Sequence, residues 1–221
     1  MSQAIVERID SEIKRRSLLK HEFYVMWSDG KLTEEHLAGY SKEYFQLVKS
    51  VPAIVKNIIT SSKAAGAYSE EYRENLLDEI SHVGLWKGFA SSVGVTDADL
   101  ASYCGAQTTR DAVSMLEGVS ESSFFEAVAA MYAFEKEIPE ISRTKMEGLA
   151  RHYGIDSPES IEYFKVHEKD DVRHAAVWRK TLASAPSEIE SRIHMAVERS
   201  LEAQNRLLDS VMDKYVRAAM V

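Results

Sequence analysis

Apolar residues recur at intervals of three and four positions along almost the whole chain. In the N-terminal segment, for example, Ile5, Ile9, Ile13 and Leu18 follow helical spacing. No segment alternates apolar and polar residues for long enough to indicate a strand, and neither an internal repeat nor a long linker interrupts the pattern. The chain is therefore expected to be all-α.

Capping residues and prolines divide this pattern into separate helices. Serine and threonine at four places precede prolines or acidic residues, as at helix N-termini: Thr33, Ser69, Ser157 and Ser187. Pro52 and Pro139 should break or kink the helices that contain them, and Gly154 should end another. These signals predict a single-domain helical bundle of seven or eight helices over residues 1–221.

Composition and charge exclude several classes of protein. Apolar residues make up 45% of the 221 positions and charged residues 28%, as in soluble globular proteins. The net charge of −8 argues against a nucleic-acid partner, and no apolar run is long enough to span a membrane. The N-terminal segment lacks the features of a secretory signal. A single cysteine, Cys104, fits a reducing compartment, so we expect a cytoplasmic protein.

The segment "YFKVHEKDDVRHAAVW", residues 163–178, contains the first candidate chemistry. Each helical residue advances about 100°, which places Tyr163, His167, Asp171 and His174 in one narrow stripe. Asp170 also lies within reach, so geometry alone does not choose between the two aspartates. Such a stripe is typical of a solvated helix face as well as of a metal site.

Two further segments favour the metal site. Glu79 and His82 form a Glu-x-x-His pair, the spacing with which helical di-iron proteins project two ligands inward. Glu135 lies within an apolar stripe, where a carboxylate is costly to bury unless it is paired or binds a metal. A surface Glu–His pair, and a lysine or arginine facing Glu135, are the alternatives. Carboxylate and imidazole ligands without thiolate suit iron or manganese.

The chain resembles the haem-oxygenase-like di-metal oxidases. Four segments carry the resemblance: "SLLKHEFYVMWSDGKL", "ENLLDEISHVGLWKGFA", "MYAFEKEIPEISRTKMEGL" and "YFKVHEKDDVRHAAVW". The similarity is greatest to the branch that contains the Chlamydia protein associating with death domains and bacterial proteins that form para-aminobenzoate. Pyrroloquinoline-quinone synthase and the thiaminase-like proteins are more distant kin.

The resemblance implies six metal ligands and two transition-metal ions, either Fe/Fe or Mn/Fe. The implied ligands are Glu79, His82, Glu135, His167, Asp171 and His174. The match selects Asp171 over Asp170. Fewer residues separate Glu79 from His82 than in the relatives, so Asp78 and Glu74 remain alternatives for the first ligand.

The same resemblance implies an O₂-dependent synthesis of para-aminobenzoate for folate, with an external reductant and no free aromatic substrate. Tyr24 matches the tyrosine that is consumed and Lys145 the amino donor, with Tyr40 and Tyr163 beside the site. Two alternatives remain: oxidation of an external small molecule, such as an amino acid or a fatty acid, or a non-enzymatic helical interaction protein. A homodimer is plausible.

Overall fold

The computed structural model describes residues 2–218, and these residues form eleven α-helices. Their bounds are α1 Ser2–Arg15, α2 Glu22–Ser28, α3 Glu34–Val48, α4 Val51–Ala64, α5 Glu70–Ser92, α6 Asp97–Ser102, α7 Gln107–Ser120, α8 Phe124–Glu135, α9 Ile138–Gly148, α10 Pro158–Leu182 and α11 Glu190–Val211. Short 3₁₀ turns lie at Leu18–Lys20 and Ser187–Ile189, and π-helical turns at Leu149–Tyr153 and Met212–Arg217. The all-α prediction is confirmed.

The expected number of seven or eight helices was too low. Pro52 and Pro139 separate helices, as expected, because each lies in the first turn of a new helix, α4 or α9. The short helix α2, of 7 residues, accounts for part of the difference, and the separation of α4 from α3 and of α9 from α8 accounts for the rest. The hydrophobic repeat of α2 is too brief to be recognised by periodicity.

Local capping fixes where the site-bearing helices begin. The hydroxyl of Ser69 accepts from the backbone N–H of Glu71 at the start of α5. Ser157 does the same for the N–H of Ser160 at the start of α10. Gly154, with φ of 66°, adopts the left-handed conformation that ends the preceding helical turn.

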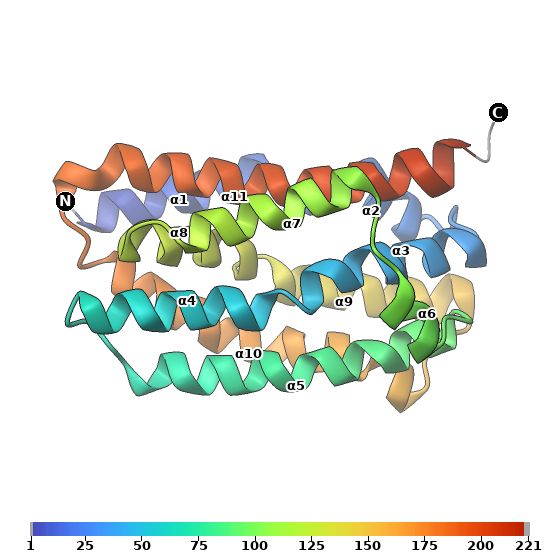
Figure 1. Cartoon of the computed structure of the whole chain (residues 1–221). Coiled ribbons are helices and arrows are strands. Elements are labelled where there is room, and N and C mark those ends of the chain that lie inside the picture. Colours follow the sequence, from blue (N-terminus) through green and yellow to red (C-terminus); the bar gives the residue numbers. More distant parts are fainter. Residues whose placement is uncertain (1, 219–221) are drawn as a thin grey trace.

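The long helices run roughly parallel or antiparallel to one another (Figure 1). The C-terminal helix α11 lies along one edge of the view, over α7 and α8, while α5 and α10 lie along the opposite edge. Helix α10 packs against α5, α9 and α8, and α11 packs against α7 and α8. None of the helices in residues 2–218 is long and apolar enough to cross a membrane.

Two large hydrophobic clusters share the interior, and the polar site lies between them. On α5, Tyr72 belongs to the first cluster and Trp86 to the second. On α10, Trp178 belongs to the first and Phe164 to the second. The stretches between these residues carry the acids and histidines predicted from sequence. Each of the two helices therefore crosses from one apolar cluster to the other through a polar segment.

Gly88 allows α5 and α10 to approach closely. A Cβ at this position would lie 2.2 Å from the backbone carbonyl oxygen of Glu159. Glycine is therefore required where the start of α10 crosses α5. This contact helps to set the separation at which the side chains of the two helices meet further along.

Candidate metal centre

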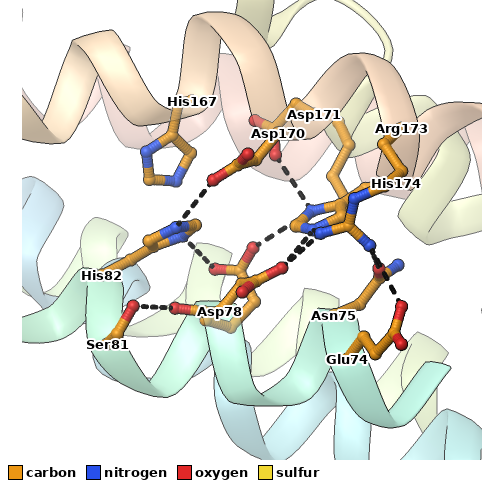
Figure 2. Close-up of polar contacts among 12 residues, drawn as sticks. Glu74, Asn75, Asp78, Ser81, His82, His167, Asp170, Asp171, Arg173 and His174 are labelled. Atoms are coloured by element: carbon orange, nitrogen blue, oxygen red, sulfur yellow. Dashed lines mark hydrogen bonds and ion pairs between the residues drawn. The ribbon is translucent and has the colours of Figure 1, made fainter. Parts of the chain in front are cut away.

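Three helices bring the six predicted ligands into one buried cluster. Helix α5 supplies Glu79 and His82, α8 supplies its last residue, Glu135, and α10 supplies the other three. Figure 2 shows side chains of α5 and α10 pointing towards one another across the space between these helices. All six are at most 5% exposed: Glu79, His82, Glu135, His167, Asp171 and His174.

Glu79 connects two groups of potential ligand atoms. Glu79, His82 and His167 offer one set of atoms within 4.8 Å of one another, and Glu79, Glu135 and His174 offer a second set. Asp171 adjoins the second group, because its Oδ1 lies 3.2 Å from Nδ1 of His174. A carboxylate shared by two ligand groups can bridge two cations, so the arrangement fits a pair of metal ions.

Several buried polar atoms of the cluster have no hydrogen-bond partner among the described residues. They are Nδ1 of His82, Oε1 of Glu135, both carboxylate oxygens of Asp171, and Nδ1 of His174. Buried polar atoms are normally satisfied, since an unpartnered one costs about 1–3 kcal/mol. Lone pairs of nitrogen and oxygen left together in this way could coordinate a cation.

Neighbouring groups contact those atoms of the predicted ligands that face away from the cluster. Nε2 of His174 lies 3.2 Å from a carboxylate oxygen of Asp78, so its Nδ1 faces the cluster. Nδ1 of His167 donates to the backbone carbonyl of Tyr163 at 2.7 Å, which leaves Nε2 free. The indole N–H of Trp178 donates to Oε2 of Glu135 at 2.6 Å. Such contacts fix tautomer and orientation in metal sites.

The alternative acids lie outside the cluster. The Asp170 side chain is 38% exposed and comes no closer than 3.9 Å to Nε2 of His82. Asp78 contacts the outer nitrogen of His174 and pairs with Arg173 (Figure 2). Glu74 is 56% exposed and lies 3.8 Å from Arg173. The geometry therefore favours Glu79 and Asp171 as ligands.

Burial and mutual charge displace the pKa values of the cluster. Burial raises the pKa of Glu135 well above its usual range and also raises that of Asp171. For His174, burial alone would lower the pKa, but the adjacent carboxylate of Asp171, 3.2 Å away, and the charge of Glu135 raise it to about 10. Without a metal, protons balance the acidic charge, so metal binding should release protons.

The predicted tyrosines and lysine form a second buried cluster, in which Lys145 is central. Its Nζ donates to the hydroxyl of Tyr40 at 2.7 Å and lies 5.2 Å from the ring centre of Tyr24. The hydroxyls of Tyr24 and Tyr40 are 3.4 Å apart. Lys145 is only 3% exposed, and this desolvation lowers its pKa to about 7. Burial raises the pKa of Tyr24, whose phenol stays protonated.

A chain of aromatic rings connects the two clusters. From the ring of Tyr40 it passes to Tyr44 at 5.2 Å, then to Trp86 at 5.0 Å. Trp86 lies 4.7 Å from Tyr163, whose ring centre is 4.1 Å from that of His167. Tyr163 therefore lies beside the predicted ligand His167, whereas Tyr40 lies beside Lys145.

Sequence reasoning missed Tyr44, Trp86 and Trp178 as members of the site. Each lies four positions after a predicted site residue: Tyr44 follows Tyr40, Trp86 follows His82, and Trp178 follows His174. Residues four apart share a helix face, so this spacing was the available signal. It was not decisive, because buried aromatic residues at helical spacing are usually core residues.

One pocket reaches the cluster from the surface. Its volume is about 380 Å³, and Asp171 is part of its lining together with residues of α8, α9 and the exposed face of α10. By contrast, the void that adjoins Tyr24 and Tyr44 measures about 10 Å³. A small molecule in the pocket would lie close to Asp171, whose own side chain is buried, while the ring of Tyr24 is packed in.

Comparison with known proteins identifies the fold and its relatives. The family described as iron-containing redox enzymes matches residues 39–205. The chain is 32% identical to a 4-aminobenzoate synthase from Nitrosomonas europaea, over 95% of this chain and 91% of that protein. It is 30% identical to a 4-aminobenzoate synthase from Chlamydia trachomatis, over 94% and 92% respectively. A haem-oxygenase-like domain from Shewanella denitrificans superposes with a TM-score of 0.79 at 18% identity, covering 96% of this chain and 92% of that one.

Proposed function

The chain belongs to the family of iron-containing redox enzymes, and from this premise we propose that it is an O₂-dependent oxygenase that forms para-aminobenzoate for folate. The ring of the product comes from Tyr24 of the chain itself, and Lys145 supplies the amino nitrogen. The name shared by the two relatives, 4-aminobenzoate synthase, supports the product.

Two transition-metal ions, Fe/Fe or Mn/Fe, would be held by the six buried ligands. Glu79, His82 and His167 would hold one ion, and Glu135, Asp171 and His174, also within reach of Glu79, would hold the other. When bound, the metals supply O₂ activation and one-electron chemistry that side chains lack. The unpartnered atoms of Asp171 and His174 support this assignment.

The observation that carries the proposal is the burial of a neutralisable amine against a packed tyrosine ring. With a pKa of about 7, Lys145 is largely unprotonated above neutral pH, so its lone pair is available as a nucleophile. Nζ is positioned by the Tyr40 hydroxyl and faces the ring of Tyr24. The surrounding rings exclude water, which would otherwise stabilise the protonated amine.

The packing around Tyr24 supports an internal substrate. A void of about 10 Å³ holds at most a single water molecule and cannot admit a free aromatic ring. A side chain that already occupies the position needs no such room. Tyr40, Tyr44, Trp86 and Tyr163 lie between this ring and the ligand histidines, where they can pass electrons as well as shield the amine.

The test is a single-turnover experiment. Protein carrying labelled tyrosine is loaded with iron and manganese, reduced, and exposed to O₂ without added aromatic compounds. Labelled para-aminobenzoate should appear at no more than one equivalent per chain, with a matching mass loss from the protein. Tyr24→Phe and Lys145→Arg should both yield none, since guanidinium stays protonated. Repeated turnover of free tyrosine, or an active Tyr24→Phe protein, would contradict the proposal.

Oxidation of an external small molecule is the second candidate. The pocket of about 380 Å³ beside Asp171 favours it, because a substrate there would adjoin the metal ligands directly. The same experiment separates the two, since an external substrate would leave the mass of the protein unchanged. Membership of a redox-enzyme family argues against a purely non-enzymatic interaction protein.

A further inference from the structure

A second surface pocket lies on the far side of the cluster from Lys145. Its volume is about 300 Å³, at the lower end of the range for small-molecule sites. Apolar side chains line it together with polar and charged ones: Ala67, Tyr72, Phe124 and Val177 with Ser69, Glu71, Lys180, Thr181 and Ser184. A planar, largely apolar molecule with polar substituents fits such a lining.

Tyr72 connects this pocket to the metal ligands through one further ring. The ring of Tyr72 is stacked on that of Trp178, with centres 5.2 Å apart and planes inclined by 16°. The indole N–H of Trp178 donates to Oε2 of Glu135 at 2.6 Å. Tyr72 is 3% exposed and Trp178 is fully buried, so both are fixed by their packing.

The Tyr72 hydroxyl does not contribute to the cluster directly. It lies 2.6 Å from Oγ1 of Thr181, and that hydroxyl in turn donates to the backbone carbonyl of Val177. This places the phenol as donor to Thr181 and holds the ring in its stacked position. A parallel stack that ends on a carboxylate ligand offers continuous π and hydrogen-bond contact from the pocket to the centre.

We propose that this pocket is the docking site of the external reductant and that Tyr72 and Trp178 are the route by which its electrons reach the metal. The reductant is of the planar dihydroflavin class. One reduced flavin gives two electrons to two iron(III) ions, which become iron(II); the flavin is oxidised and its two protons go to solvent. Tyr72 and Trp178 end unchanged. This inference rests on the proposed metal centre.

The test follows reduction of the metal rather than product formation. Iron-loaded, air-oxidised protein is made anaerobic and mixed with reduced flavin mononucleotide, and flavin oxidation is followed by stopped-flow absorbance. Trp178→Phe removes the hydrogen bond to Glu135 and should slow the reduction by about tenfold or more, as expected when a partner of a metal ligand is lost. Tyr72→Leu removes the ring stacked on Trp178 and should also slow the reduction, with Glu135 and its partner intact. Iron content and thermal unfolding are measured on every variant, so that loss of metal is not read as slow transfer.

Two matched variants block one pocket each. Ala67→Trp fills the pocket at Tyr72, and Ala176→Trp fills the pocket that reaches Asp171. The first should slow reduction by flavin by about tenfold, and the second should leave it unchanged. If all four iron-loaded variants are reduced as fast as the wild-type protein, or if Ala176→Trp alone is reduced more slowly, the inference is overturned. Wild-type protein that binds no iron would instead overturn the proposed function.

Discussion

Glu43 and Asp171 are both buried carboxylates, but within residues 2–218 only one of them is hydrogen-bonded by other protein groups. Glu43 on α3 is completely buried, and protein groups satisfy it: it accepts from the Tyr103 hydroxyl, from the backbone N–H of Ala106 at 3.0 Å and from Nζ of Lys214 at 3.2 Å. Asp171 on α10 is equally buried, yet neither of its oxygens has a hydrogen-bond partner among the described residues.

The contrast is between a carboxylate that stabilises the fold and one whose oxygens are available to bind a ligand. The acid at Glu43 joins α3 to the segment before α7 and to the C-terminal turn, and the fold itself supplies its cation and donors. The acids near Glu79 repel one another and are balanced by histidines whose inner nitrogens are also unpartnered. Burial alone therefore does not mark a candidate ligand, whereas burial without hydrogen-bond partners does.

The largest difference should appear when each of the two neighbouring aspartates on α10 is replaced by alanine. Asp171→Ala removes both inward-facing oxygens and should abolish bound metal and product formation. Asp170→Ala, at a side chain 38% exposed, should retain most of both. Elemental analysis of purified protein and the product assay measure the difference. The opposite behaviour of the two variants would mean that the register of α10 assumed here is wrong.

Matched glutamine variants test the contrast in stability. Glu43→Gln removes the buried charge that accepts from Tyr103, from Ala106 and from the half-exposed Lys214, and losing such charge-assisted hydrogen bonds costs about 1.5–3 kcal/mol of unfolding free energy. In metal-free protein, Glu135→Gln should leave stability unchanged or raise it, since burial already favours the neutral form of Glu135 and the amide oxygen still accepts from Trp178. Urea unfolding of metal-free protein gives both values. Equal destabilisation by the two would remove the distinction.

A smaller effect on metal affinity is expected when the acid that contacts a predicted ligand from outside the cluster is replaced. Asp78→Asn weakens the contact to Nε2 of His174 and should reduce metal affinity about 10–100-fold. Glu74→Gln is the control, because Glu74 is exposed and contacts only Arg173 in this region. Competition with a chelator reports both affinities. If Glu74→Gln weakens binding as much as Asp78→Asn, then surface charge rather than orientation of His174 is responsible.

Much of this site was predictable because its spacing is helical. Residues three, four and seven apart on α10 necessarily share a face, so Tyr163, His167, Asp171 and His174 could be grouped without a structure. The choice between Asp170 and Asp171 was not available from spacing. It depends on how α10 is rotated against α5, which distant contacts such as that of Gly88 help to determine.

The surroundings of Lys145 were not predictable in the same way. Its burial results from the packing of rings on α2, α3 and α10, and no local pattern encodes contacts between residues so far apart. The satisfied acid Glu43 shows the same limit, because its partners Tyr103 and Lys214 lie 60 and 171 residues further along the chain. Helix boundaries and faces are local properties, whereas the pKa of a buried group is a property of the assembled fold.

The smallest predicted effect is a pH dependence of stability that distinguishes Lys145 from a residue without charge. Between its folded pKa of about 7 and its ordinary value of 10.5, the unfolded chain holds a proton on Lys145 that the folded chain lacks. Stability therefore rises with pH through this window, at most on the order of 1 kcal/mol per pH unit. Metal-free wild type should gain stability relative to Lys145→Met from pH 7 to pH 9 in urea unfolding, and both proteins carry the other titrating groups alike. Parallel curves would show that Lys145 keeps an ordinary pKa, and the amine would then be protonated at neutral pH and unable to act as a nucleophile.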